Sequence, residues 1–226
     1  MEKRYERNHS TISEEDMVVL KNSKVLVVGC GGLGGYIIEM LIRIGLGYLT
    51  VVDGDVFEES NLNRQLYSTM KNLGMSKAEA VKARVHLVNP DTELIAVSHK
   101  LTPENIHSII RDHDLVIDAV DNIETRLLLE ATCCEHDLPL IHGAIAGWYF
   151  QLSVIIPGDN LLSKIYGSSS EKGIESVLGN PSFTPAAAAS FQVAECIKVL
   201  LNKDLPLKGK LLYVDLLNNS FDILEI

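Results

Sequence analysis

Short apolar runs alternate along most of the chain with segments whose apolar residues recur at helical spacing. The runs predict six strands, over Val25–Gly29, Leu49–Asp53, Glu93–Ser98, Leu115–Val120, Leu140–Ala144 and Phe150–Ile156. The segments between them predict helices over Leu33–Ile44, Ser76–Val88 and Thr125–His136, and a short helix after Pro103. Continuous apolar runs are typical of strands buried on both faces. The alternation therefore predicts an α/β fold of the Rossmann type, a mostly parallel sheet with helices on both faces.

The beginning and the last third of the chain have other patterns. Residues 1–22 predict a polar N-terminal arm with some helix, and residues 158–184, rich in Gly, Ser and Asn, predict an exposed, flexible crossover loop. The Ala-rich segment Ala186–Leu201 predicts another helix, and Lys210–Leu216 with Ser220–Ile226 predicts a C-terminal antiparallel hairpin. We expect a single domain over 1–226, because this length fits one large domain.

Composition and charge narrow the classes of protein. The chain has 226 residues, of which 46% are hydrophobic, and a formal net charge of -10. That balance argues against a nucleic-acid partner, because phosphate backbones require clustered Lys and Arg. The apolar runs are too short to cross a membrane, and the charged N-terminus has no apolar signal region. We therefore expect a cytoplasmic protein with neither a nucleic-acid nor a membrane partner.

The four cysteines predict no metal site. Cys30, Cys133, Cys134 and Cys196 contain no CxxC pair, which structural zinc sites usually require, so no zinc is expected. We expect these side chains to pack as small apolar residues in a reducing compartment.

A glycine-rich segment follows the first predicted strand. Residues 29–34 read GCGGLG and supply the glycines Gly29, Gly31, Gly32 and Gly34. Glycines at a strand–helix junction allow a phosphate to approach the backbone, where the helix N-terminus favours negative charge. Asp53, 19 residues after Gly34, ends the second strand and is suited to a ribose hydroxyl. The pattern favours nucleotide binding over glycines kept only for packing. Alone it does not separate NAD from ATP, and it would suggest a dehydrogenase.

The polar segment after the second strand changes that interpretation. Arg64 and Lys77 could neutralise phosphates from two sides, and the amides of Asn61 and Gln65 could orient phosphate oxygens. Taken singly, either charge could instead be a solvated surface group. Together they favour phosphate transfer over hydride transfer.

Carboxylates at the end of the fourth strand complete the candidate site. Asp121 is suited to Mg²⁺ beside a triphosphate, or it could cap the following helix. Asp118, inside the strand, is either a structural carboxylate or a second metal contact. His142, near the end of the fifth strand, either lines the site or is a structural histidine.

Several motifs together resemble the ThiF/MoeB/HesA family, bacterial relatives of ubiquitin-activating enzymes. The matching pieces are VVGCGGLGG, IGLGYLTVVDGDVFEESNLNRQ, the segment 74–77, VNPD at 88–91, DLVIDAVDNIETR at 114–126 and AECIKVLL at 194–201. The resemblance spans about residues 4 to 217. The combination of SNLNRQ, Lys77 and DAVDN is specific, whereas the glycine loop alone is not.

The resemblance implies an ATP- and Mg²⁺-dependent adenylyltransferase. Such enzymes adenylate the C-terminal carboxylate of a small ubiquitin-like sulfur carrier that ends in Gly-Gly, and they release pyrophosphate. By motif, Gly32 would lie at the phosphates and Asp53 at the ribose, and Asp121 would bind Mg²⁺ with Asn122 beside it. The residues that would hold the triphosphate are Asn61, Arg64, Gln65 and Lys77.

The family's Arg-Tyr-x-Arg pattern is present as residues 4–7. In dimeric members its second arginine reaches the partner's active site. The resemblance therefore implies a homodimer in which Arg7 is supplied in trans to the phosphates.

The sequence departs from the family pattern in its cysteines. The two CxxC pairs that hold zinc in many members are missing, and no cysteine lies in 158–184, where a thioester or persulfide step would be expected. Adenylation is therefore expected to be the whole reaction. A small-molecule carboxylic acid as substrate, an NAD-dependent oxidoreductase and a non-catalytic nucleotide-binding regulator remain alternatives.

Overall fold

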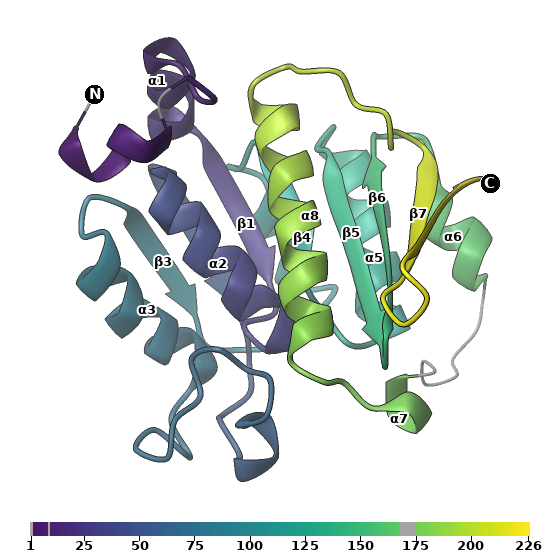
Figure 1. Cartoon of the computed structure of the whole chain (residues 1–226), viewed down its shortest axis with the longest axis horizontal. Coiled ribbons are helices and arrows are strands. Elements are labelled where there is room, and N and C mark those ends of the chain that lie inside the picture. Colours follow the sequence, from purple (N-terminus) through teal and green to yellow (C-terminus); the bar gives the residue numbers. More distant parts are fainter. Residues whose placement is uncertain (1, 9, 168–174) are drawn as a thin grey trace.

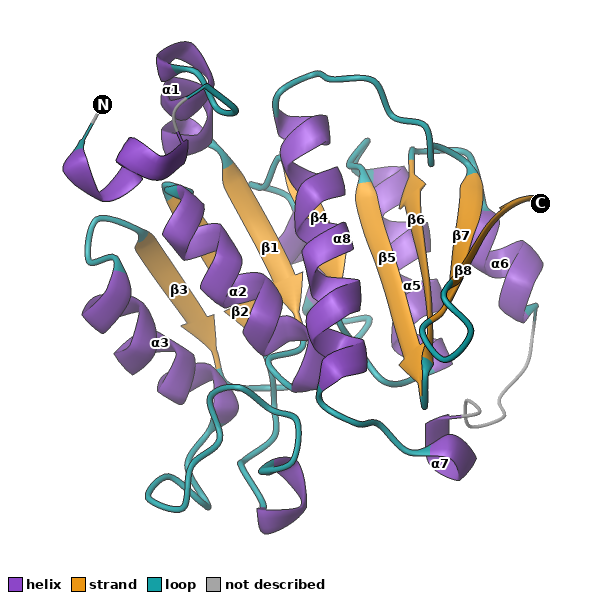
Figure 2. Ribbon diagram, in the orientation of Figure 1, coloured by secondary structure: helices purple, strands orange, loops and turns teal. Residues whose placement is uncertain are grey.

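One eight-stranded sheet forms the centre of the computed structural model, which describes residues 2–8, 10–167 and 175–226 (Figures 1 and 2). The strands are β1 (Lys24–Val28), β2 (Tyr48–Val52), β3 (Glu93–Val97), β4 (Leu115–Asp118), β5 (Leu140–Ala146), β6 (Tyr149–Ile155), β7 (Lys210–Asp215) and β8 (Ser220–Glu225). Their spatial order is β3-β2-β1-β4-β5-β6-β7-β8. The first five pair in parallel and the last three antiparallel, so the predicted mostly parallel sheet with a C-terminal hairpin is confirmed.

Helices cover both faces of the sheet, as predicted (Figure 1). On one face lie α2 (Gly32–Ile44), α3 (Lys77–Val88) and α8 (Phe183–Leu200), and on the other α4 (Ile106–Ile110), α5 (Ile123–Glu135) and α6 (Leu161–Tyr166). Successive residues of a strand point to opposite faces. In β1, Val25 and Val27 accordingly join the core under α2, whereas Leu26 and Val28 join the core under α5.

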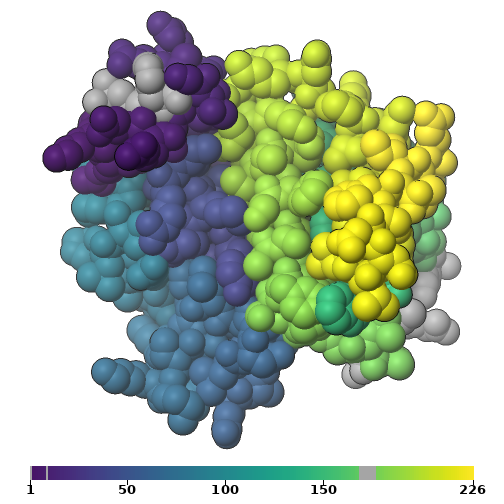
Figure 3. Space-filling view, viewed as in Figure 1, coloured from purple at the N-terminus to yellow at the C-terminus, as the bar shows by residue number. Residues whose placement is uncertain are grey.

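The N-terminal segment packs against the C-terminal end of α2. It consists of the 3-10 helix η1 (Lys3–Asn8) and α1 (Glu14–Asn22). The buried Tyr5 ring lies against Gly45, where a Cβ atom would approach the ring within 3.0 Å. Asn89 Nδ2 donates to Tyr5 Oη over 2.8 Å. In the space-filling view this segment occupies one corner, above residues of α2 and α3 and away from the C-terminal strands (Figure 3).

The prediction of a loop over 158–184 is wrong for part of that range. It contains α6 and a short helix, α7 (Glu175–Leu178), while 168–174 lie outside the described residues. Leu161 and Leu162 of α6 are buried. Glu130 of α5 holds the start of α6, because it accepts hydrogen bonds from the backbone of Leu162 and Ser163 over 2.6 and 2.9 Å. This tertiary contact, and not local propensity, stabilises the helix.

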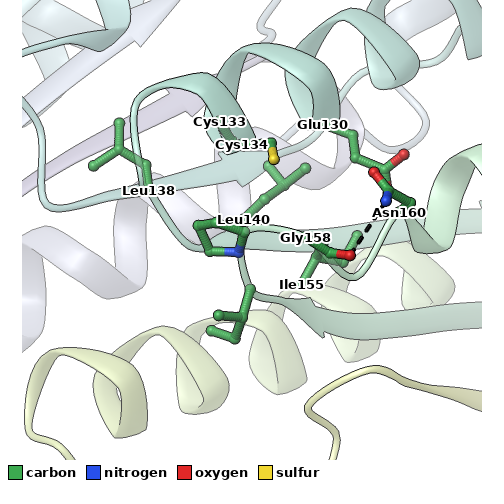
Figure 4. Close-up of a pocket in the computed structure, with 10 residues that line it drawn as sticks. Glu130, Cys133, Cys134, Leu138, Leu140, Ile155, Gly158 and Asn160 are labelled. Carbon is green, nitrogen blue, oxygen red and sulfur yellow. Dashed lines mark hydrogen bonds between the residues drawn. The ribbon is translucent and has the colours of Figure 1, made fainter.

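Glu130 also borders a small cavity at the end of α5 (Figure 4). Its volume is about 10 Å³, which holds at most one water molecule, so it is not a ligand site. Cys133 and Cys134 line it. The predicted burial of the cysteines is correct for Cys30, Cys133 and Cys196 and wrong for Cys134, which is exposed.

No helix in the described part of the chain is long and apolar enough to cross a membrane.

Candidate functional site

A cleft of about 910 Å³ opens at the carboxyl ends of the parallel strands. Its lining comes from the residues that follow β1, β2, β3 and β4, together with residues of β5 and a segment before α8. The strand order reverses between β1 and β4, because β2 and β3 lie to one side and β5 to the other. Open α/β sheets bind ligands at this reversal, since the connecting helices diverge there.

The glycine loop forms the floor of the cleft between β1 and α2. Gly29 has φ +100°, and a Cβ atom on it would lie 2.5 Å from the carbonyl oxygen of Ala119. A Cβ atom on Gly34 would lie 1.8 Å from the carbonyl oxygen of Gly29. These two glycines are therefore required for the close approach of the loop to β4 and α2. Gly31 and Gly32 instead face side chains of the cleft, Gln65 and Arg64 respectively.

Asp53 connects the glycine loop with the loop after β2. One carboxylate oxygen accepts from the backbone N–H of Cys30 over 2.7 Å, and the other accepts from that of Asp55 over 2.8 Å. Each carboxylate oxygen has capacity for a second hydrogen bond. Asp53 lines the cleft, and its contact with a ribose stays a prediction.

Arg64, Gln65 and Lys77 line the same cleft. Lys77 is the first residue of α3 and is buried, with its Nζ 3.3 Å from Asp55 Oδ2. Arg64 is partly exposed and donates to Ser60 O over 3.0 Å. The two cations therefore reach the cleft from separate elements.

Asp121 and Asn122 line the cleft from the end of β4. Asn122 caps α5, since its side-chain oxygen accepts from Thr125 N over 2.8 Å. Asp121 is exposed, and its contact with Asn122 is 3.5 Å long. Among the described residues no three His, Cys, Asp or Glu side chains form a group that could hold a metal by itself. A single carboxylate suits Mg²⁺, which takes its other ligands from phosphates and water.

Three predicted residues do not line the cleft. Gly34 packs beneath the loop, as described above. Asn61 is buried in the 3-10 helix η2 (Glu59–Asn61), where its side-chain oxygen accepts from Glu58 N over 3.0 Å. Arg7 is exposed on η1, at the far end of α2. Because α2 has 13 residues, that end lies about 20 Å from the glycine loop.

Asp118 and His142 are fully buried and contact each other, with His142 Nδ1 2.7 Å from Asp118 Oδ2. Neither side chain is among the described residues that line the cleft. The geometry favours the structural alternative for both side chains over direct contact with a ligand.

Sequence reasoning missed Lys100 and Asn180, which also line the cleft. Lys100 Nζ lies 3.8 Å from Asp55 Oδ1. The position of Lys100 two residues after the third predicted strand would have placed it at this edge. Asn180 accepts through its backbone oxygen from Asn63 Nδ2 over 3.2 Å, which connects the Arg64 loop with the chain before α8. The two residues are 117 positions apart, so no local sequence pattern predicts their contact.

Two features of the cleft fit a ligand that carries both hydroxyl and phosphate groups. Gln65 Oε1 is buried and has no hydrogen-bond partner among the described residues, and as an amide oxygen it can accept from a ligand's hydroxyl or amino group. Gly31 and Gly32 leave the backbone at the start of α2 uncovered by side chains of their own. The N–H groups of a helix start favour an anion.

Comparison with known proteins supports the resemblance found in the sequence. The ThiF family model matches residues 5–226. The chain is 35% identical to the SAMP-activating enzyme E1 of Haloferax volcanii, over 90% of this chain and 76% of the relative. It is also 35% identical to the sulfur carrier protein adenylyltransferase of Thermus thermophilus, over 95% of this chain and 83% of the relative.

A solved structure, that of Escherichia coli MccB with ATP, superimposes with a TM-score of 0.84 at 20% identity, covering 100% of this chain and 72% of the other. At that identity the likeness concerns the fold alone. The family match and the two relatives carry the stronger statement. The chain belongs to the ThiF family.

Proposed function

We propose that the protein is an adenylyltransferase that uses Mg²⁺ and ATP to activate the C-terminal glycine of a ubiquitin-like sulfur-carrier protein. The observation that carries the proposal is the convergence of Arg64, Lys77 and the exposed carboxylate of Asp121 on a cleft floored by the glycine loop. Relatives named as sulfur carrier protein and molybdopterin-synthase adenylyltransferases match most of the chain, which supports the same reaction.

The reaction requires no nucleophile from the protein. A carboxylate oxygen of the carrier attacks the α-phosphorus of ATP, the bond from that phosphorus to the bridging oxygen breaks, and pyrophosphate leaves with the electron pair. The protein's contribution is therefore position and charge around the phosphates. Arg64 and Lys77 would stabilise the charge on the leaving pyrophosphate, and Asp53 would hold the ribose.

The charge balance of the cleft supports a need for Mg²⁺. The basic side chains that line it are Arg64, Lys77, Lys100 and Arg126, and the acidic ones are Asp53, Asp55, Asp121 and Glu124. Because these charges cancel, a triphosphate would meet little net positive charge. Mg²⁺ held by Asp121 and phosphate oxygens would supply it.

A homodimer is part of the proposal. Arg7 lies too far from the cleft of its own chain to contact a nucleotide there. Its exposure on η1 leaves it accessible to a second copy. A dimer that brings η1 to the partner's cleft would add one positive charge to each site.

The alternatives differ in their support. The names of the relatives favour a protein carrier over a small carboxylic acid. An NAD-dependent oxidoreductase would leave Arg64, Lys77 and Asp121 without a role. A nucleotide-binding regulator would not turn ATP over.

The test is exchange of labelled pyrophosphate into ATP, with and without a panel of Gly-Gly carriers. We expect exchange that requires both Mg²⁺ and a carrier, and none with a carrier whose terminal carboxylate is amidated. Exchange with a metabolite acid and with no carrier would replace this proposal with the small-acid alternative. Absence of turnover together with tight NADH binding would replace it with the oxidoreductase.

A further inference from the structure

The turn that carries Asp121 is fixed at the residue before it. The N–H of Val120 donates to Asp118 Oδ1 over 3.0 Å. The carbonyl oxygen of Val120 accepts from Arg126 Nη2 over 2.7 Å. Both polar groups of Val120 are therefore held by side chains, which limits where Asp121 can point.

The carboxylate of Asp118 is itself held by His142, which lies on the neighbouring strand β5. The Asp118 side chain is fully buried, so its carboxylate requires partners inside the protein. Arg126 Nε lies 3.4 Å from Asp118 Oδ2 but forms no hydrogen bond, whereas His142 Nδ1 lies 2.7 Å from the same oxygen. His142 thus provides the short contact to the oxygen that Val120 does not use.

The hydrogen-bonding state of His142 follows from its surroundings. Burial lowers the pKa of His142 below its ordinary value of 6.5, although the carboxylate of Asp118 opposes the shift. A neutral ring carries one proton, and a carboxylate at Nδ1 places that proton on Nδ1. Nε2 is then the acceptor, and the amide nitrogen of Gln151 lies 3.3 Å from it.

We propose that His142 is a positioning residue for the metal–nucleotide complex: by donating to Asp118 it fixes the Val120 peptide and, through it, the carboxylate of Asp121. The inference rests on the proposed function, in which Asp121 holds Mg²⁺ beside ATP. Removal of a residue that orients a metal ligand lowers the affinity for the metal by about 10- to 100-fold.

Substitution of His142 by Asn or by Gln distinguishes this positioning role from a role in core packing alone. The amide nitrogen of Asn reaches about as far from the backbone as Nδ1 of a histidine, and that of Gln about as far as Nε2. His142→Asn therefore retains the donor to Asp118, whereas His142→Gln and His142→Leu remove it. Arg126→Gln loosens the backbone of Val120 from its carbonyl side, at the peptide group that joins it to Asp121.

The experiment measures binding of α,β-methylene-ATP by calorimetry to the wild-type protein and the four variants, once with Mg²⁺ and once with EDTA. Thermal melting establishes that each variant is folded at the working temperature. With Mg²⁺ we expect wild-type affinity for His142→Asn and a loss of about 10-fold for the other three. With EDTA we expect the wild type and the three His142 variants to bind alike. If His142→Leu does not fold, His142→Gln and Arg126→Gln decide the question.

The outcomes separate this inference from the function on which it rests. Equal Mg²⁺-dependent affinity in all folded variants would overturn the role of His142, and so would a loss of the same size with and without Mg²⁺. A His142→Asn variant as weak as His142→Gln would do the same. A wild-type protein that binds no nucleotide would instead overturn the proposed function, and the inference with it.

Discussion

Asp121 differs from Asp53 and Asp55, two other acidic side chains of the cleft, in its surroundings. Asp53 accepts two backbone hydrogen bonds, and Asp55 lies between Lys77 and Lys100. Asp121 has no ion pair among the described residues and is exposed. A carboxylate in that state is available to a cation, and its loss costs the fold little.

Asp121→Asn is expected to reduce Mg²⁺-dependent pyrophosphate exchange by about 100-fold or more, because a bound metal contributes several kcal/mol to a phosphoryl-type transition state. The melting temperature is expected to stay at the wild-type value. Asp112→Asn, at the opposite end of β4, is the matched control and should exchange normally. Undiminished exchange by Asp121→Asn would remove Asp121 from the metal site.

Most of the predicted site residues line the cleft, because parallel strands end at one edge of the sheet. That rule places Asp53 and Asp121 from strand boundaries alone. It fails for Asn61, since the direction of a loop amide depends on the 3-10 turn that it caps. It fails also for Asn180, whose place beside Asn63 follows from the path of the whole chain.

Among the elements, α6 shows what local sequence does not encode. Its six residues lie between Gly158 and Gly167, in a segment whose Gly, Ser and Asn content is typical of a loop. So short a helix is unstable alone. Its first turn is stabilised by Glu130, 32 residues away from Leu162. The longer helices α2 and α5, in contrast, could be predicted to within two residues because each carries an apolar face over more than three turns.

Glu130→Ala is expected to lower the free energy of unfolding by about 2 to 3 kcal/mol, because it removes the charged acceptor of Leu162 N and Ser163 N. Denaturation in urea measures the change. Glu135→Ala, on the same helix but exposed, serves as the control and should change stability by less than about 0.5 kcal/mol. Equal effects of the two substitutions would show that Glu130 does not hold α6.

At the scale of the whole molecule, the N-terminal segment and the cleft occupy opposite ends of α2. The fold therefore keeps Arg7 away from the cleft of its own chain, and under the proposed function any contribution it makes to catalysis requires a second subunit. The position of a second copy could not be predicted from the sequence pattern, because a dimer interface has no period along the sequence.

Mixing of two inactive variants tests this arrangement. Arg7→Ala and Arg64→Ala are each expected to lose most exchange activity. After unfolding and refolding together in equal amounts, activity should recover to about one quarter of the wild-type value, because half of the dimers are mixed and each mixed dimer has one intact site of two. Sedimentation should show a dimer. Mixed dimers without recovered activity would contradict a role of Arg7 in trans.

The burial of the cysteines bears on the fate of the activated carrier. Burial raises the pKa of Cys30, Cys133 and Cys196, so these groups remain thiols and are poor nucleophiles. The exposed Cys134 lies 12 positions after Asn122 on α5, about 18 Å along the helix from the cleft. Under the proposed function, the acyl adenylate then waits for a nucleophile that none of these four cysteines supplies at the cleft of its own chain. Its useful yield is then set by a competition between hand-over to that acceptor and hydrolysis of the anhydride by water.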